Sequence, residues 1–202
     1  MFGFVYREIM QALIDMDKMF SLLDVKPEVT DKLNAPQLAL AEGAIAFEGV
    51  HFAYDPRRPI LQGVSFEVPA GKTVAVVGPS GAGKSTIGRL LYRFYDVQKG
   101  RITIDGQDLR DVDQTSVRAA IGTVPQDTVL FNDSILYNVL YGRQDASLEE
   151  AKEAARLARI ADFVESLPDG WDAEVGERGL KLSGGEKQRV AIARAILKNP
   201  II

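Results

Sequence analysis

The sequence contains no cysteine and a single histidine among its 202 residues. Without cysteine the chain has no disulfide scaffold, no catalytic thiol and no thiolate metal ligand. One histidine argues against a histidine-rich metal site. Lysine and arginine number 24 against 28 for aspartate and glutamate, giving a net charge of −4. This balance argues against a nucleic-acid partner bound through a broad basic surface.

Long apolar runs are also missing. No stretch approaches the ~18 apolar residues that predict a membrane-spanning helix. The short apolar start is followed at once by Arg7 and Glu8, which is a poor pattern for a secretory leader. Apolar residues make up 46% of the chain and charged residues 26%, as in a folded globular domain. The length suits one domain, since domains typically have about 100–200 residues.

The first 23 residues have the spacing of an amphipathic helix. Apolar residues recur at intervals of four and three, which predicts one apolar face on a helix over residues 8–23. They are Ile9, Leu13, Met16, Phe20 and Leu23. The helix could pack on the rest of the chain or serve a partner outside it. The second is favoured, because residues 24–43, with prolines and scattered charges, read as a linker.

The globular part is expected to begin near residue 44. From there, strand patterns alternate with helix patterns along the chain. Strands are predicted at 45–52, 63–68, 73–77, 101–104 and 121–124, and helices at 84–95, 134–140, 147–165 and 186–198. This alternation predicts an α/β domain with a largely parallel sheet. The continuous apolar run at 73–77 is expected to be a strand buried on both faces.

The strongest motif is Gly78-Pro79-Ser80-Gly81-Ala82-Gly83-Lys84-Ser85-Thr86, which fits the phosphate-binding pattern G-x-x-x-x-G-K-[ST]. Its glycines let backbone N–H groups wrap around phosphate oxygens, and the following helix N-terminus adds partial positive charge. Lys84 is expected to reach the β- and γ-phosphates and Ser85 to bind Mg²⁺. Thr86 is expected to contact the α-phosphate, although it could simply be an early helix residue. The motif therefore indicates a nucleoside triphosphate bound with Mg²⁺.

A second glycine cluster lies in residues 182–189. Ser183 and Glu186 fit a capping box that opens the helix predicted at 186–198. A cap does not need the two consecutive glycines Gly184 and Gly185, which would let a ligand approach the backbone closely. A helix N-terminus also receives anions. Because the P-loop already serves one nucleotide, this surface suggests a nucleotide held by another copy of the chain.

Residues 182–189 closely resemble the signature motif of ATP-binding cassette (ABC) proteins, and the resemblance covers about residues 44–202. It implies a P-loop NTPase core with an N-terminal antiparallel β region and an α-helical signature subdomain. Tyr54 matches the aromatic residue that stacks on adenine, although alone it could be an ordinary surface tyrosine. Gln126 matches the glutamine that touches Mg²⁺ or the attacking water and couples to a transport partner, although alone it would be an ordinary polar loop residue. Residues 174–179 resemble the short motif that exporters carry before the signature.

The resemblance also implies partners and a location. In this family two nucleotide-binding domains pair head to tail and hold ATP with Mg²⁺ between the P-loop of one and the signature of the other. A head-to-tail homodimer is therefore expected, in agreement with the two glycines at 184 and 185. Residues 4–9 and 11–20 resemble the extension after the last membrane helix in mitochondrial-type and heavy-metal-tolerance half-size exporters. Residues 1–23 would then continue from a transmembrane domain of the same full-length protein, with the ABC domain at the cytoplasmic face of the membrane.

Hydrolysis by a P-loop protein requires a carboxylate near Mg²⁺. In the family this Walker B carboxylate ends an apolar strand after the signature helix. Here Ile201 and Ile202 resemble the start of that strand, and no acid follows them in the sequence. Asp105 is rejected as a substitute, because its strand is short and it fits a non-catalytic family segment. We therefore expect a C-terminally incomplete domain, without the catalytic glutamate and switch histidine, that is inactive and poorly stable alone and exposes an apolar surface beside the P-loop strand.

Three functions fit these features. The chain could be the ATP-binding domain of an ABC exporter, a soluble ABC ATPase of DNA repair or translation, or an ATP-binding fragment without hydrolysis. The second is opposed by the net charge and by the lack of a coiled-coil insertion or a second cassette. The first is favoured for the parent protein, and the third describes the chemistry of this chain. The transported substrate is not readable from these residues.

Overall fold

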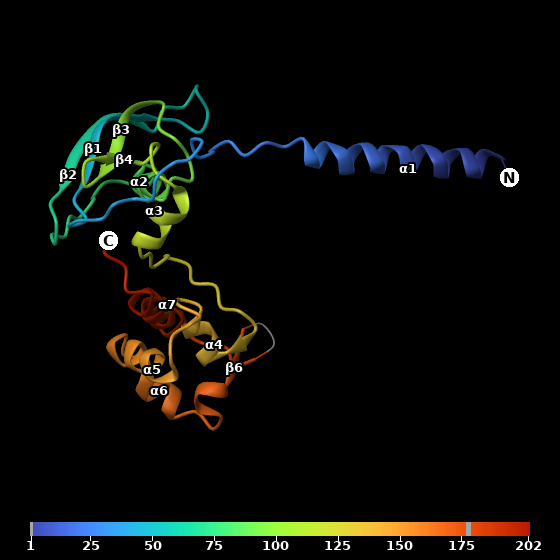
Figure 1. The fold of residues 1–202 in the computed structure, drawn as a ribbon. Coiled ribbons are helices and arrows are strands. Elements are labelled where there is room, and N and C mark those ends of the chain that lie inside the picture. Colours follow the sequence, from blue (N-terminus) through green and yellow to red (C-terminus); the bar gives the residue numbers. More distant parts are fainter. Residues whose placement is uncertain (1, 177–178) are drawn as a thin grey trace.

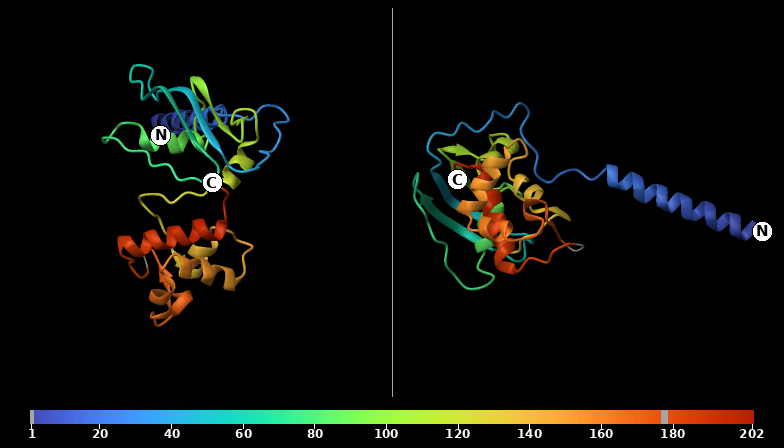
Figure 2. Two further views of the ribbon diagram at one scale, coloured as in Figure 1. Left: turned by 90° about the vertical axis from the view of Figure 1, so that its left-hand side faces the viewer. Right: turned by 90° about the horizontal axis from the view of Figure 1, so that it is seen from below.

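The computed structural model describes residues 2–176 and 179–202. Helix α1 (Phe2–Leu23) projects away from two lobes, a β-lobe and a helical lobe, which are joined by an extended segment (Figure 1). We define the β-lobe as residues 30–122 and the helical lobe as residues 128–198; each has its own apolar core. Figure 2 shows the same separation from two further directions.

Helix α1 confirms the predicted helix and begins six residues earlier than the pattern suggested. None of its described residues is buried, so the alternative in which it packs on the rest of the chain is wrong. Its apolar stripe, including Leu13 and Phe20, is open to solvent. Among the described residues no helix combines the length and apolarity needed to cross a membrane.

The β-lobe is built on a four-stranded sheet with the order β2-β1-β3-β4. Its strands are β1 (Ile45–Phe52), β2 (Leu61–Val68), β3 (Lys99–Ile104) and β4 (Gln107–Asp108). Phe47 pairs with Phe66 on one side and with Ile102 on the other. The rings of Phe47 and Phe66 stack with their centroids 4.5 Å apart. Helices α2 (Lys84–Leu91) and α3 (Gln114–Ala120) complete this lobe.

The helical lobe packs short helices around the long helix α7 (Gly184–Lys198). The other helices are α4 (Ile135–Leu140), α5 (Leu148–Leu157), α6 (Ala161–Glu165) and the 3₁₀ turn η1 (Gly170–Asp172). Strands β5 (Asp133–Ser134) and β6 (Glu174–Val175) form a short antiparallel pair. The core consists mainly of small and branched side chains such as Ala151, Ala155 and Val190.

The prediction of a largely parallel sheet is wrong, since all four strand pairs of the described chain are antiparallel. The predicted strands at 73–77 and 121–124 are not formed. A strand needs a neighbour for its backbone groups, and no described segment pairs with residues 73–77, whose Val77 is 87% exposed. At 121–124 the backbone pairing with the C-terminal residues is short: Ile202 O accepts from Gly122 N at 2.8 Å. The predicted exposed apolar surface in this region is confirmed.

Two predicted helices end earlier than expected. The helix predicted at 84–95 stops at Leu91, and Arg93 has φ +50°. The helix predicted at 147–165 divides into α5 and α6, because Arg159 between them has φ +59°. A residue with left-handed backbone angles ends a right-handed helix. Such residues are usually glycine, and because both are arginine here, the sequence did not predict that the helices end there.

The segment between α1 and β1 contains no helix or strand, but side chains fasten its second half to the β-lobe. The carboxylate of Asp105 accepts hydrogen bonds from the consecutive backbone N–H groups of residues 41–44, at 2.8–3.1 Å. Ser116 Oγ accepts another from Leu38 N at 2.9 Å. Asp105 therefore has a structural role, in line with its rejection as a catalytic acid.

Candidate functional site

The glycines of the P-loop adopt backbone conformations that other residues avoid. Gly81 has φ +83° and Gly83 has φ +91°. A Cβ atom added to Gly83 would also lie 2.9 Å from Ile60 Cγ2. Gly83 is the N-cap of α2 and makes no side-chain cap. Thr86 N already donates to Gly83 O at 3.0 Å, so the N–H groups of Lys84 and Ser85 are the ones at the helix start that a ligand could use. This geometry suits a bound anion.

Lys84 is held within its own loop. Its Nζ donates to Gly78 O at 2.8 Å and to Pro79 O at 2.7 Å. These carbonyl oxygens are uncharged, whereas a phosphate oxygen carries negative charge and adds Coulomb attraction to its hydrogen bond with the ammonium group. Phosphate oxygens can therefore replace the two carbonyls as partners of the ammonium group.

Ser85 and Thr86 follow Lys84 in the first turn of α2. Ser85 is exposed, and its hydroxyl is a hard oxygen of the kind that binds Mg²⁺ together with phosphate oxygens and water. Thr86 is only 5% exposed, and its Oγ1 accepts a hydrogen bond from Tyr54 Oη at 3.4 Å. Ser85 therefore fits the predicted Mg²⁺ ligand. The predicted contact of Thr86 with the α-phosphate stays a prediction, and its side chain is buried and hydrogen-bonded to Tyr54.

The structure brings Tyr54 to the P-loop helix, 32 positions along the chain from Thr86. Its ring meets Phe52 and Tyr95 edge to face, with centroid distances of 4.9 and 5.1 Å. Arg89 donates to Tyr54 Oη at 3.1 Å. Burial alone would raise the pKa of Tyr54, but the hydrogen bonds with Thr86 and Arg89 outweigh burial and lower the pKa. Tyr54 remains 44% exposed, which leaves it accessible to a ligand.

The predicted capping box at the second glycine cluster is confirmed. Ser183 Oγ accepts from Glu186 N at 3.3 Å, and Glu186 Oε2 accepts from Ser183 N at 2.7 Å. A Cβ atom on Gly184 or Gly185 would meet nothing within 4 Å, and neither glycine has a positive φ. Nothing in the described chain therefore requires glycine at these positions, and the backbone there is open to a close approach from outside.

The two glycine clusters lie on different lobes. The P-loop opens α2 in the β-lobe, and residues 183–186 open α7 in the helical lobe. Among the described residues no hydrogen bond joins the two clusters. Gln126 is exposed in the segment that connects the lobes. Within one chain, Tyr54 therefore contacts the P-loop helix, whereas Gln126 and the signature residues lie apart from the P-loop.

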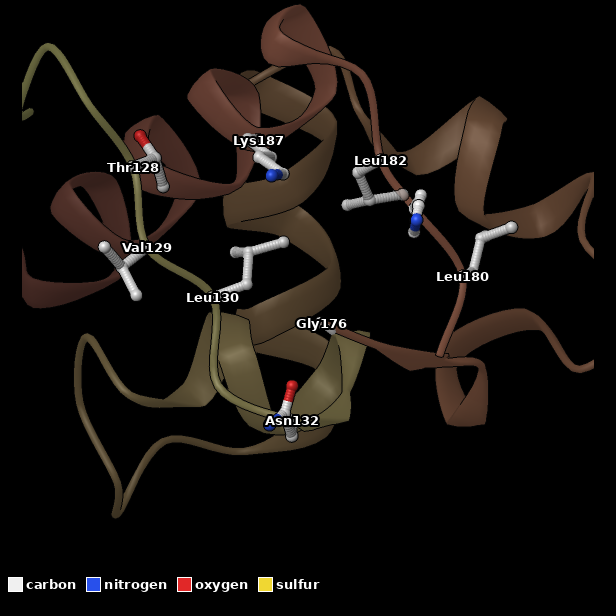
Figure 3. A pocket seen from close by; sticks show the side chains of 9 residues that line it. Thr128, Val129, Leu130, Asn132, Gly176, Leu180, Leu182 and Lys187 are labelled. Atoms are coloured by element: carbon white, nitrogen blue, oxygen red, sulfur yellow. The ribbon is translucent and has the colours of Figure 1, made fainter. Parts of the chain in front are cut away.

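An open cleft of about 650 Å³ lies beside the signature residues (Figure 3). Its walls come from residues 128–130 and Asn132, which follow Gln126, from Gly176 and residues 180–182, and from Lys187 of α7. Its lining is mixed: Val129, Leu130 and Leu182 supply apolar side chains, and Thr128 and Lys187 supply polar ones. The segment after Gln126 and the segment before the signature therefore line the same cleft.

Two further predictions concern acids. In the motif at residues 174–179, Glu177 and Arg178 lie outside the described residues. Within the described part of the chain there is no group of three histidine, cysteine, aspartate or glutamate side chains placed to hold a metal. Ser85 and Gln126 stay the predicted protein ligands of Mg²⁺.

Comparison with known proteins identifies the family. Residues 61–202 match the family model described as "ABC transporter". The chain belongs to this family. Its ABC transporter core has the expected mixed α/β architecture, with antiparallel strands and a helical signature lobe.

Close relatives are ABC exporters of one branch. The chain is 63% identical, over its full length, to an "ATM1-type heavy metal exporter" of Novosphingobium aromaticivorans, of which it covers 33%. It is 56% identical over 98% of its length to the human "Iron-sulfur clusters transporter ABCB7, mitochondrial", of which it covers 27%. The solved structure of "a bacterial Atm1-family ABC exporter with ATP bound" superposes with a TM-score of 0.91 at 63% identity, over 98% of this chain and 35% of that one. The chain thus spans about a third or less of the length of these relatives, and the predicted resemblance to mitochondrial-type and heavy-metal exporters is confirmed.

Arg89 is the site residue that the sequence analysis missed. It lies four positions after Ser85 and so follows it by one turn of α2. That spacing places a cation next to the P-loop, but the contact with Tyr54 depends on a fold that brings together residues 35 positions apart.

Proposed function

We propose that residues 44–202 are the ATP-binding domain of an ABC exporter. The P-loop geometry carries this proposal: glycines with positive φ, an uncapped helix N-terminus and the Lys84 ammonium converge on one loop. Free backbone N–H groups of the P-loop would bind the phosphates, and Lys84 would neutralise part of their charge. Tyr54 would stack on adenine and Ser85 would bind Mg²⁺. Gln126 is separate from the P-loop in this structure and would have to move toward it to serve as the second Mg²⁺ ligand.

We propose that two copies pair head to tail. The P-loop of one copy and residues 183–186 of the other would then enclose each ATP. Support comes from the separation of the two clusters on different lobes and from the open space around Gly184 and Gly185. A phosphate approaching the N-terminus of α7 would meet backbone rather than side chains.

The remaining regions are proposed to connect this domain to the membrane. Residues 1–23 would continue from a transmembrane domain, with residues 24–43 as the link, and the domain would lie at the cytoplasmic face. The apolar stripe of α1 has no partner among the described residues, which supports a partner elsewhere in the full-length protein. The cleft lined by Val129 and Leu182 offers a second contact surface for that partner. The printed names of the relatives support an exporter linked to heavy-metal or iron–sulfur chemistry.

For the 202-residue chain alone we propose ATP binding without turnover. The acid considered as a substitute, Asp105, is committed to the backbone of residues 41–44. Steady-state hydrolysis by this chain should equal that of Lys84→Ala, and a version extended through the downstream coding sequence should exceed both. Hydrolysis by the short chain well above the Lys84→Ala control would instead show that the chain carries its own catalytic acid.

Cross-linking tests the pairing directly, since the sequence has no cysteine of its own. Ser80→Cys and Ser183→Cys chains are mixed and oxidised with and without MgATP. Head-to-tail pairing predicts a mixed disulfide between the two variants that forms only with MgATP. Ser147→Cys, at the equivalent cap of α5, is the matched control and should not cross-link to Ser80→Cys. Cross-links of Ser80→Cys with itself would contradict the arrangement.

A further inference from the structure

Arg89 reaches from α2 to the aromatic side chain at the end of β1. Its Nη1 donates to Tyr54 Oη at 3.1 Å, and its guanidinium carbon lies 6.0 Å from the centre of the Tyr54 ring. Among the described residues Tyr54 is the one side-chain hydrogen-bond partner of Arg89. The guanidinium group is therefore directed at the ring rather than at the loop that precedes α2.

The contact completes a set of restraints on Tyr54. Phe52 and Tyr95 meet its ring edge to face, and Thr86 accepts from its hydroxyl group. Without Arg89 the hydroxyl would keep one long hydrogen bond of 3.4 Å. Arg89 thus supplies the stronger of the two hydrogen bonds that fix the end of the ring.

Fixing this ring has a consequence for binding. When a planar ligand stacks on a ring that is already held in place, binding does not lose the conformational entropy of that ring. Next to the ring lies an open cleft of about 480 Å³, with Tyr54, Tyr95 and Gln98 among its lining residues. The cleft leaves space for a planar group against the aromatic cluster.

We propose that Arg89 is a positioning residue for the nucleobase: it holds the plane of Tyr54 for stacking and does not bind the phosphates. This inference rests on the proposed ATP site. It predicts that Arg89 contributes to the affinity for a nucleoside triphosphate and contributes nothing to the affinity for its phosphate chain alone. Loss of one hydrogen bond, worth about 1 kcal/mol, corresponds to about a fivefold loss of affinity.

Calorimetric titration of the 202-residue chain with MgATP and with magnesium tripolyphosphate tests the proposal. Arg89→Ala should weaken MgATP about fivefold and leave tripolyphosphate binding unchanged. Tyr54→Phe should have a similar effect, and the double variant should lose no more than the larger single loss, because both remove the same contact. Arg101→Ala, an exposed arginine paired with Glu48 on the same lobe, should change neither affinity.

Each other outcome overturns the proposal. An equal loss for both ligands would make Arg89 a phosphate-binding residue, and no loss for either would remove its role. Additive losses in the double variant would show that Arg89 acts independently of the Tyr54 hydroxyl. A wild-type chain that binds neither ligand would overturn the proposed function itself, and this inference with it. Circular dichroism spectra matching the wild type establish that the variants are folded.

Discussion

Arg93 Nη1 donates to Asp31 Oδ1 at 2.8 Å, although the two residues are 62 positions apart. Arg93 follows the P-loop helix α2 and is 2% exposed, whereas Asp31 belongs to the segment that leads from α1 to the β-lobe. The same guanidinium group donates to Asp96 at 3.0 Å and to Val112 O at 3.1 Å. A buried cation thus joins the helix of the P-loop to the connection with α1.

Arg93→Ala is expected to destabilise the chain by about 3 kcal/mol, because it leaves buried hydrogen-bond acceptors and the Asp31 carboxylate without their partner. Urea unfolding followed by circular dichroism measures this loss. The control is Arg101→Ala, which breaks the exposed pair with Glu48 and should cost at most about 1 kcal/mol. Similar losses in the two variants would mean that the buried network adds no stability.

Asp105 is expected to make stability depend on pH. Burial alone would raise its pKa, but the backbone N–H groups of residues 41–44 outweigh burial and lower the pKa below its ordinary value of 3.8. Its contribution is therefore fully present above that value and is lost as the pH falls through the lower folded-state pKa. The stability difference between wild type and Asp105→Asn should be constant near neutral pH and should shrink as the pH falls below about 4. A difference that persists unchanged in acid would rule out this role of the carboxylate.

Ser183→Arg should leave ATP binding by the single chain intact and abolish pairing, because a long cation would fill the open space at the start of α7. Loss of the cap itself is expected to cost about 1 kcal/mol. Sedimentation velocity with MgATP measures the pairing.

Ser147→Arg provides the control for this variant, since Ser147 and Glu150 form the same kind of capping box on α5. It should lose similar stability and still pair. If Ser183→Arg still pairs, or if both variants fail to pair, the proposed interface at the signature would be wrong.

The features that the sequence predicted well depend on neighbouring residues. The capping box at Ser183 and the strand at 45–52 form as predicted, because their determinants lie within a few positions. The prediction of a strand at 73–77 was wrong. The local apolar pattern favours a strand, but a strand also needs a pairing partner from a distant segment. The helix breaks at Arg93 and Arg159 carry no glycine and so gave no signal.

The candidate site shows the same division. The P-loop was recognisable because its glycines, Lys84 and Ser85 are contiguous in sequence. Tyr54 was assigned through the family resemblance, and the structure then placed it against Thr86. The contacts made by Arg89 and Arg93 were not predicted, because each joins residues that only the folded chain brings together.

Isothermal titration of the 202-residue chain with MgATP, beside Lys84→Ala, tests the central claim most directly. Lys84 Nζ now bonds Gly78 O and Pro79 O, and we expect phosphate oxygens to take their place. A hydrogen bond to a charged group is worth about 1.5–3 kcal/mol, so Lys84→Ala should weaken binding at least about tenfold. The account predicts saturable binding by the wild type and this loss in the variant. No binding by the wild type, or equal affinity in the two chains, would contradict it.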